Sequence, residues 1–176
     1  MILGLDISTS IIGYTVLDSQ SNIMVCEAWD LRNDKTYKNI YEKASFVKRE
    51  LIRLKEEYDI SKVFIEEPFT FFSSGGSTAK TMAKLQSFNG MISWVCVDVF
   101  NIVPSHISPG DARKSNKIKV SKGQKAKQVV LNYLLEHEPA FKAKYTKKGN
   151  PIPETYDRAD SLIVARAGYQ IQGENK

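Results

Sequence analysis

The pattern of apolar and polar residues changes its period along the chain, and each change marks a predicted element. Three short apolar runs open the sequence, at residues 2–7, 11–17 and 22–31, and their composition predicts strands. Residues 8–10 turn the chain between the first two runs, which predicts a hairpin with Gly13 at its tight point. Because the three runs follow one another closely, we expect them to pair as consecutive antiparallel strands.

After the third run, helical spacing and short apolar runs alternate. The predicted helices cover residues 37–58, 78–99, a short segment from Pro109, 125–138 and 156–171. The predicted strands cover residues 61–68 and 102–107, and the main loops are 69–77, 117–123 and 143–153. This order predicts an α/β fold of the ribonuclease H-like type, a five-stranded mixed sheet flanked by helices with its first three strands antiparallel, in a single domain spanning residues 1–176.

The composition describes an ordinary soluble protein, with 42% apolar and 26% charged residues. Cys26 and Cys96 lie in apolar runs without the spacing of a metal site, so we interpret them as buried hydrophobic residues in a reducing compartment. No basic segment precedes the first strand, and polar residues interrupt the longest apolar run, at 91–103. We therefore expect no signal peptide, no membrane span and a cytoplasmic location.

The net charge of +5 is concentrated in two segments. Residues 113–127 carry seven basic and no acidic side chains, and residues 142–148 carry four more lysines, again without an acid. The rest of the chain is therefore net negative. A lysine-rich solvated surface would explain either segment alone, but their clustering favours an anionic partner, and nucleic acid in particular.

Several carboxylates interrupt apolar surroundings. Asp6 lies inside the first strand, and Glu66 and Glu67 end the fourth, which this topology places beside the first. Asp157 and Asp160, three residues apart at the predicted start of the last helix, share one helical face, where capping alone would explain them. Strand alternation sends Glu66 and Glu67 to opposite faces, and it leaves open which of them faces Asp6.

An unpaired carboxylate inside a buried strand costs several kcal/mol, so Asp6 requires a partner such as a cation. Oxygen donors converging from three elements suit a hard cation, Mg²⁺ or Mn²⁺. Two such ions activate a water and stabilise the leaving oxygen in phosphodiester hydrolysis. The acids and the basic segments together therefore predict a metal-dependent nuclease.

Three motifs carry a resemblance to a known family: residues 4–10 with Gly13-Tyr14, Ile65-Glu66, and residues 157–162. In this order they resemble the RuvC-type Holliday junction resolvases, most closely the phage and poxviral members, from Ile2 to about Ala167. Ile7-Ser8 stands where many relatives have Pro-Gly, which loosens the assignment of the first turn. The resemblance implies that the metal ligands are Asp6, Glu66, Asp157 and Asp160, and it thereby favours Glu66 over Glu67.

The resemblance also implies roles for other segments. Phe69 matches a phenylalanine that wedges into the junction centre, and Phe71 and Phe72 could share this stacking or pack into the core. Lys117 and Lys125 are the nearest matches to catalytic lysines, with Lys114 and Lys122 as alternatives. The expected DNA-binding residues are Phe69, Phe71, Phe72, Arg113, Lys114, Lys117, Lys119, Lys122, Lys125 and Lys127. Relatives are homodimers, and helix 78–99 is the expected interface, although its apolar stripe could equally be core.

The expected function is resolution of four-way DNA junctions by paired, metal-dependent nicks that leave 5′-phosphate and 3′-hydroxyl ends. Alternatives with the same fold are a nuclease for RNA–DNA hybrids or for flapped and other branched DNA, and an inactive junction-binding protein. An ATP-binding protein of the sugar kinase and actin type is disfavoured, because Ser8 replaces a required glycine and 176 residues leave no room for a second nucleotide-binding domain.

Overall fold

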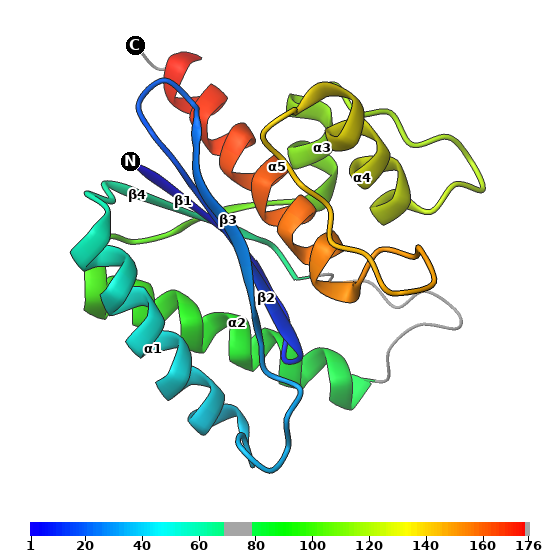
Figure 1. Ribbon diagram of the computed structural model, residues 1–176. Coiled ribbons are helices and arrows are strands. Elements are labelled where there is room, and N and C mark those ends of the chain that lie inside the picture. Colours follow the sequence, from blue (N-terminus) through cyan, green and yellow to red (C-terminus); the bar gives the residue numbers. More distant parts are fainter. Residues whose placement is uncertain (69–78, 175–176) are drawn as a thin grey trace.

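The computed structural model describes residues 1–68 and 79–174, which form one mixed sheet with helices on both faces (Figure 1). The strand order is β3-β2-β1-β4-β5. β1 pairs antiparallel with β2, β2 pairs antiparallel with β3, and β1, β4 and β5 run parallel. The predicted five-stranded mixed sheet is confirmed, with strands β1 Ile2–Ile7, β2 Ile11–Leu17, β3 Ile23–Asp30, β4 Lys62–Glu66 and β5 Ser105–Ile107.

Five helices accompany the sheet in the described residues. Two long helices, α1 (Ile40–Glu57) and α2 (Ala79–Phe100), cover one face. The other face carries α3 (Pro109–Ser115), α4 (Ala126–His137) and α5 (Pro153–Glu174), and α5 lies directly against the strands (Figure 1). Within the described residues, no helix has both the length and the apolar character needed to cross a membrane.

Strand alternation separates the interior into two apolar clusters. Leu3 and Leu5 of β1 pack toward α1 and α2, together with the stripe Phe88, Ile92 and Val95 of α2. The apolar stripe of α2 is therefore core, which answers the question that the sequence left open. The second cluster lies under α3, α4 and α5, and it is the face to which the intervening β1 residues point.

α5 approaches the sheet at backbone distance because glycines face it. A Cβ on Gly4 would lie 2.7 Å from the Cβ of Ala165, and a Cβ on Gly13 would lie 1.9 Å from the carbonyl oxygen of Asp157. Gly13 is paired with Asp6 inside the β1–β2 ladder, so it is not the tight point of the hairpin as predicted. Its role is to admit the backbone of α5.

The last helix begins three residues before its predicted start, at Pro153. Asp157 and Asp160 therefore lie beyond the first turn, where the stabilisation of negative charge by the helix dipole has largely decayed. Glu154 is the acidic residue of that first turn. The position of the two aspartates is thus not explained by capping.

Candidate active site

Three elements bring the four predicted acids to the α5 side of the sheet. Leu5 pairs with Ile65 in the parallel β1–β4 ladder, so Asp6 and Glu66 follow at the same level of adjacent strands. Gly13, across the ladder from Asp6, touches the backbone of α5 at Asp157. Asp6, Asp157 and Asp160 are all buried, with at most 9% of each residue exposed. Close packing of α5 on β2 therefore places its two aspartates beside the strand acids.

The structure places Glu66, rather than Glu67, on the face of Asp6. Phe64 of β4 packs toward α5, and alternation sends Glu66 to the same side. Glu67 is exposed, and its backbone N–H donates to the carbonyl of Ile107 at 2.9 Å. Buried Asn89 of α2 donates through Nδ2 to the carbonyl oxygen of Glu66 at 3.3 Å, which holds the end of the strand in place.

The acids strongly disfavour one another's ionisation. Burial, followed by the charges of Glu66 and Asp160, raises the pKa of Asp6 well above its usual value. Burial and the charge of Asp160 raise the pKa of Glu66 to about 8, and burial raises that of Asp160 to about 6 despite the nearby ammonium of Lys127. A bound cation would offset this repulsion and favour the ionised form of the acids.

A cation of the chain itself already contacts the cluster. Lys127 Nζ lies 2.9 Å from Asp157 Oδ1 and 3.3 Å from Asp160 Oδ2. Burial lowers the pKa of this ammonium, but the charges of Asp6, Asp160 and Asp157 outweigh burial and raise it overall. Arg113 adds a more distant positive charge that lowers the pKa values of Glu66 and Asp160.

The donor set suits a hard divalent cation, because it consists of carboxylate oxygens only. Within residues 1–68 and 79–174, no three acidic, histidine or cysteine side chains are arranged as a ready-made metal site. Instead, the ammonium of Lys127 bridges two of the four acids. A lysine held in this way shows that the cluster binds positive charge, and it would have to yield some of its contacts to an incoming ion.

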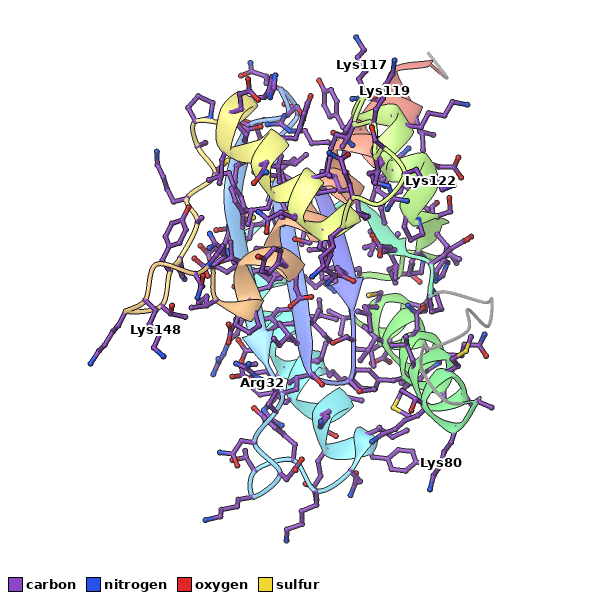
Figure 2. All side chains as sticks on the ribbon, turned by 90° about the vertical axis from the view of Figure 1, so that its right-hand side faces the viewer. Arg32, Lys80, Lys117, Lys119, Lys122 and Lys148 are labelled. Carbon is purple, nitrogen blue, oxygen red and sulfur yellow. The ribbon has the colours of Figure 1, made fainter. Side chains whose placement is uncertain are left out.

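The predicted basic segment lines a groove that extends from Arg113, whose charge acts on Glu66 and Asp160, to Lys117, which lies near Gln170 toward the C-terminal end of α5. The volume of the groove is about 460 Å³, and its lining residues are Gly110, Arg113, Lys114, Lys117, Ile118, Lys119 and Val120. Figure 2 shows Lys117 and Lys119 at the top of the molecule, at the C-terminal end of α5, and Lys122 below them. Lys125 caps α4 through its backbone, and its side chain forms no capping hydrogen bond. Phe69, Phe71 and Phe72 lie outside the described residues.

Sequence reasoning assigned Lys127 to DNA binding and proposed Lys117 and Lys125 for the lysines nearest the reaction; these roles remain predictions. A signal for Lys127 was present, since it precedes buried Val130 and Leu131 of α4 by three and four residues. That spacing puts it on the inward face of the helix.

Arg158 was also missed, although it is almost fully buried. Its Nε donates to the carbonyl of Cys26 at 2.8 Å, its Nη1 donates to the carbonyl of Lys142 at 3.0 Å, and its guanidinium lies 5.4 Å from the ring centre of Phe141. A buried arginine between two aspartates therefore ties α5 both to β3 and to the preceding loop.

No family model matches this sequence, and no curated protein matches it either. Solved structures do match. Thermus thermophilus RuvC in complex with a Holliday junction substrate aligns with a TM-score of 0.63 at 13% identity, over 98% of this chain and 94% of that one. The fold is that of RuvC. A second Thermus thermophilus RuvC structure gives 0.60 at 12% identity over 98% and 96% of the two chains.

The yeast mitochondrial Holliday junction resolvase Ydc2 gives a TM-score of 0.62 at 15% identity, over 98% of this chain and 79% of that one. At such low identity the likeness establishes the RuvC fold, while the residues of this chain must carry any functional argument. The convergence of Asp6, Glu66, Asp157 and Asp160 on one face of that fold is the feature on which such an argument rests.

Proposed function

We propose that this protein is a metal-dependent endonuclease that resolves four-way DNA junctions. The observation that carries the proposal is the cluster of four carboxylates, three of them buried, in a RuvC-type sheet whose α5 side also carries a groove lined by arginine and lysine, with Arg113 acting on Glu66 and Asp160. Buried acids that raise one another's pKa lower stability, so a function must retain them. The solved RuvC neighbour bound to a Holliday junction supports the substrate.

Asp6, Glu66, Asp157 and Asp160 would hold the divalent cation, with Mg²⁺ as the expected ion and Mn²⁺ as a substitute. When bound, divalent ions supply activation of the attacking water and charge stabilisation at the leaving oxygen, which gives 5′-phosphate and 3′-hydroxyl ends. Lys127 exchanges its contacts with Asp157 and Asp160 for a phosphate oxygen of the substrate. A lysine ammonium is charged at neutral pH, so Lys127 keeps its charge when it leaves the carboxylates that raise its pKa here.

The basic groove would hold the sugar–phosphate backbone on one side of the cut. Lys117, Lys119 and Lys122 lie toward one end of the molecule in Figure 2, and Lys80 lies toward the opposite end, where Arg32 is paired with Asp30 and Glu154. Cations at both ends of an acidic centre suit a branched substrate, whose arms leave the branch point in different directions. Phosphate contacts of this kind position DNA without reading its sequence.

Two nicks require two sites, and we propose that α2 provides a homodimer interface through its outward face. Trp94 is 61% exposed there, one turn after Gly90. A Cβ on Gly90 would meet no atom within 4 Å, although glycine in mid-helix costs about 1 kcal/mol relative to alanine. Close approach of a second helix at Gly90 would explain why a glycine occupies this unfavourable position in α2.

The test of the function uses a labelled immobile four-way junction with Mg²⁺, beside linear duplex, a flap and an RNA–DNA hybrid. Paired symmetric nicks in the junction alone, abolished by Asp6→Asn with junction binding retained, would support the proposal. Equal cutting of flap or hybrid would replace it with a broader nuclease. Tight junction binding without cutting in Mg²⁺ or Mn²⁺ would leave a structure-specific binding protein.

The test of the dimer is sedimentation of Trp94→Glu against Tyr41→Glu, an exposed aromatic on α1 that serves as a matched control. We expect the first variant to become monomeric and to lose paired nicking, while the second sediments as the wild type does. A wild-type monomer on junction DNA would refute the interface.

A further inference from the structure

The segment between α4 and α5 forms a hairpin that neither the acid site nor the basic groove uses. Tyr145 and Pro151 form an isolated antiparallel bridge, and the N–H of Ile152 donates to the carbonyl of Lys144 at 3.0 Å. At its tip, Thr146 N–H donates to the carbonyl of Asn150 at 2.8 Å, and Gly149 turns the chain at φ 79°. This hairpin, residues 144–151, contains Lys144, Lys147 and Lys148 of the second basic segment of the sequence.

The charges at the tip of the hairpin are not neutralised. Lys147 and Lys148 are exposed, and neither forms an ion pair with any described residue. Lys144, at the base, is instead paired with Glu27 at 2.8 Å. The chain has no acidic residue between Glu138 and Glu154, so the tip presents positive charge alone. Tyr145, 53% exposed, adds a flat ring beside these lysines.

The base of the hairpin is fixed to the helix that carries the site. Thr155, fully buried in the first turn of α5, bonds to both backbone groups of Lys144, accepting from its N–H at 3.1 Å and donating to its carbonyl at 2.9 Å. Arg158 holds the carbonyl of Lys142, just before the hairpin. The tip therefore has a defined position relative to Asp157 and Asp160.

We propose that the hairpin is a second DNA-binding element, whose tip lysines grip the backbone of one duplex arm at a fixed distance from the scissile phosphate. The inference rests on the proposed function, which it deepens. Figure 2 shows Lys148 at the left edge of the molecule, well apart from Lys117, Lys119 and Lys122 at its top and upper right. The arm held by the hairpin is therefore not the backbone held by the basic groove.

The distance follows from chain geometry. Asp157 lies four residues into α5 from Pro153, which is about 6 Å along the helix axis. Lys148 lies at the turn of the hairpin, and the five residues from Lys148 to Pro153 span at most about 17 Å. A reach of at most about 23 Å corresponds to no more than about seven nucleotides at about 3.4 Å each. The contacted phosphates should lie within that distance of the cut.

The experiment measures binding to an immobile junction in EDTA, so that it does not depend on cleavage. Uncharged methylphosphonate linkages replace the phosphates of each arm one at a time, and affinities are compared for wild type, Lys147→Gln/Lys148→Gln and Lys62→Gln. Lys62 is an exposed lysine at the opposite end of β4 from Glu66, so it serves as the control. Thermal unfolding checks that all three proteins are folded.

We expect two or three adjacent linkages at which wild type and Lys62→Gln lose affinity several-fold while the double variant, already weaker, loses none. Its slope of log affinity against log salt should also fall by about 1–2. An equal response of all three proteins at every linkage would overturn the inference. If only the double variant is insensitive to those linkages and no cleavage occurs in Mg²⁺, the DNA-binding role of the hairpin is supported and the nuclease proposal is refuted. If the junction is cleaved but all three proteins respond equally to every linkage, only the role of the hairpin is refuted.

Discussion

Gly13→Ala tests directly how α5 is seated on the sheet. The added Cβ would lie 1.9 Å from the carbonyl oxygen of Asp157 and 2.3 Å from its carbonyl carbon, whereas real Cβ contacts are essentially never below 3.0 Å. Relief requires a displacement of about 1 Å between β2 and the turn of α5 that carries Asp157. Neither partner is the end of a flexible side chain, so the backbone itself must move.

The cost of such overpacking is about 1–3 kcal/mol, which for a chain of this size lowers Tm by roughly 2–4 °C per kcal/mol. The same displacement moves Asp157 away from Asp6. A 1 Å misplacement of a catalytic group can cost about 100-fold in rate, so we expect cleavage to fall by one to two orders of magnitude at temperatures where the variant remains folded.

Urea unfolding and junction cleavage would be measured together, with Gly110→Ala as the control for unfolding. A Cβ on Gly110 meets only Ser108 Oγ, at an ordinary 3.7 Å, so that variant should keep a stability close to wild type. If Gly13→Ala unfolds within about 0.5 kcal/mol of wild type and cleaves at the same rate, the seating of α5 on Gly13 is wrong.

Three further outcomes follow from the site. Because Glu66, with its pKa raised to about 8, holds a proton that the unfolded chain releases near its ordinary value of 4.5, stability without metal should fall as pH rises from about 5 to 8. Urea unfolding in EDTA should show a flatter pH dependence for Glu66→Gln, and an unchanged slope would contradict the assignment. Lys127→Ala removes the ammonium that competes for Asp157 and Asp160, so calorimetry should show tighter Mg²⁺ binding; weaker binding would mean that the ion sits elsewhere. Arg158→Lys cannot span Cys26 and Lys142, and it should cost about 2 kcal/mol in urea unfolding, whereas Arg53→Lys, on the surface of α1, should cost nothing measurable.

The sheet was predictable because each strand has its own local signature. The apolar runs fixed the strands to within a few residues, and the α/β order then left few ways to pair them. The start of α5 was predicted three residues late, since Pro153 is the first helical residue and Pro151 lies in the hairpin just before it. Hairpin 144–151 was read as loop, because a single bridge leaves no alternating pattern.

The acids were predictable, but their partners were not. Asp6 stands out because a carboxylate in an apolar strand contradicts its surroundings, and the same contrast marks Glu66. Lys127 and Arg158 each lie in a helix with other charged residues, and they differ from the surface residues only in lying on its inward side. Gly13 was misread as a turn residue, because a glycine that admits a neighbouring backbone and one that bends a hairpin look alike in sequence.

Gly13, Lys127 and Arg158 have in common that their contacts with the first three turns of α5 were not predicted from the sequence. Gly13 allows that part of the helix to touch the sheet, Lys127 neutralises its two aspartates, and Arg158 ties it to β3 and to the segment before the hairpin. The pairing of β1 with β4 brings Asp6 and Glu66 together, but Asp157 and Asp160 reach them only if α5 packs against the sheet in this way. The alignment of one helix end therefore decides whether four scattered carboxylates form a site, and Gly13→Ala perturbs that alignment without altering any charged side chain.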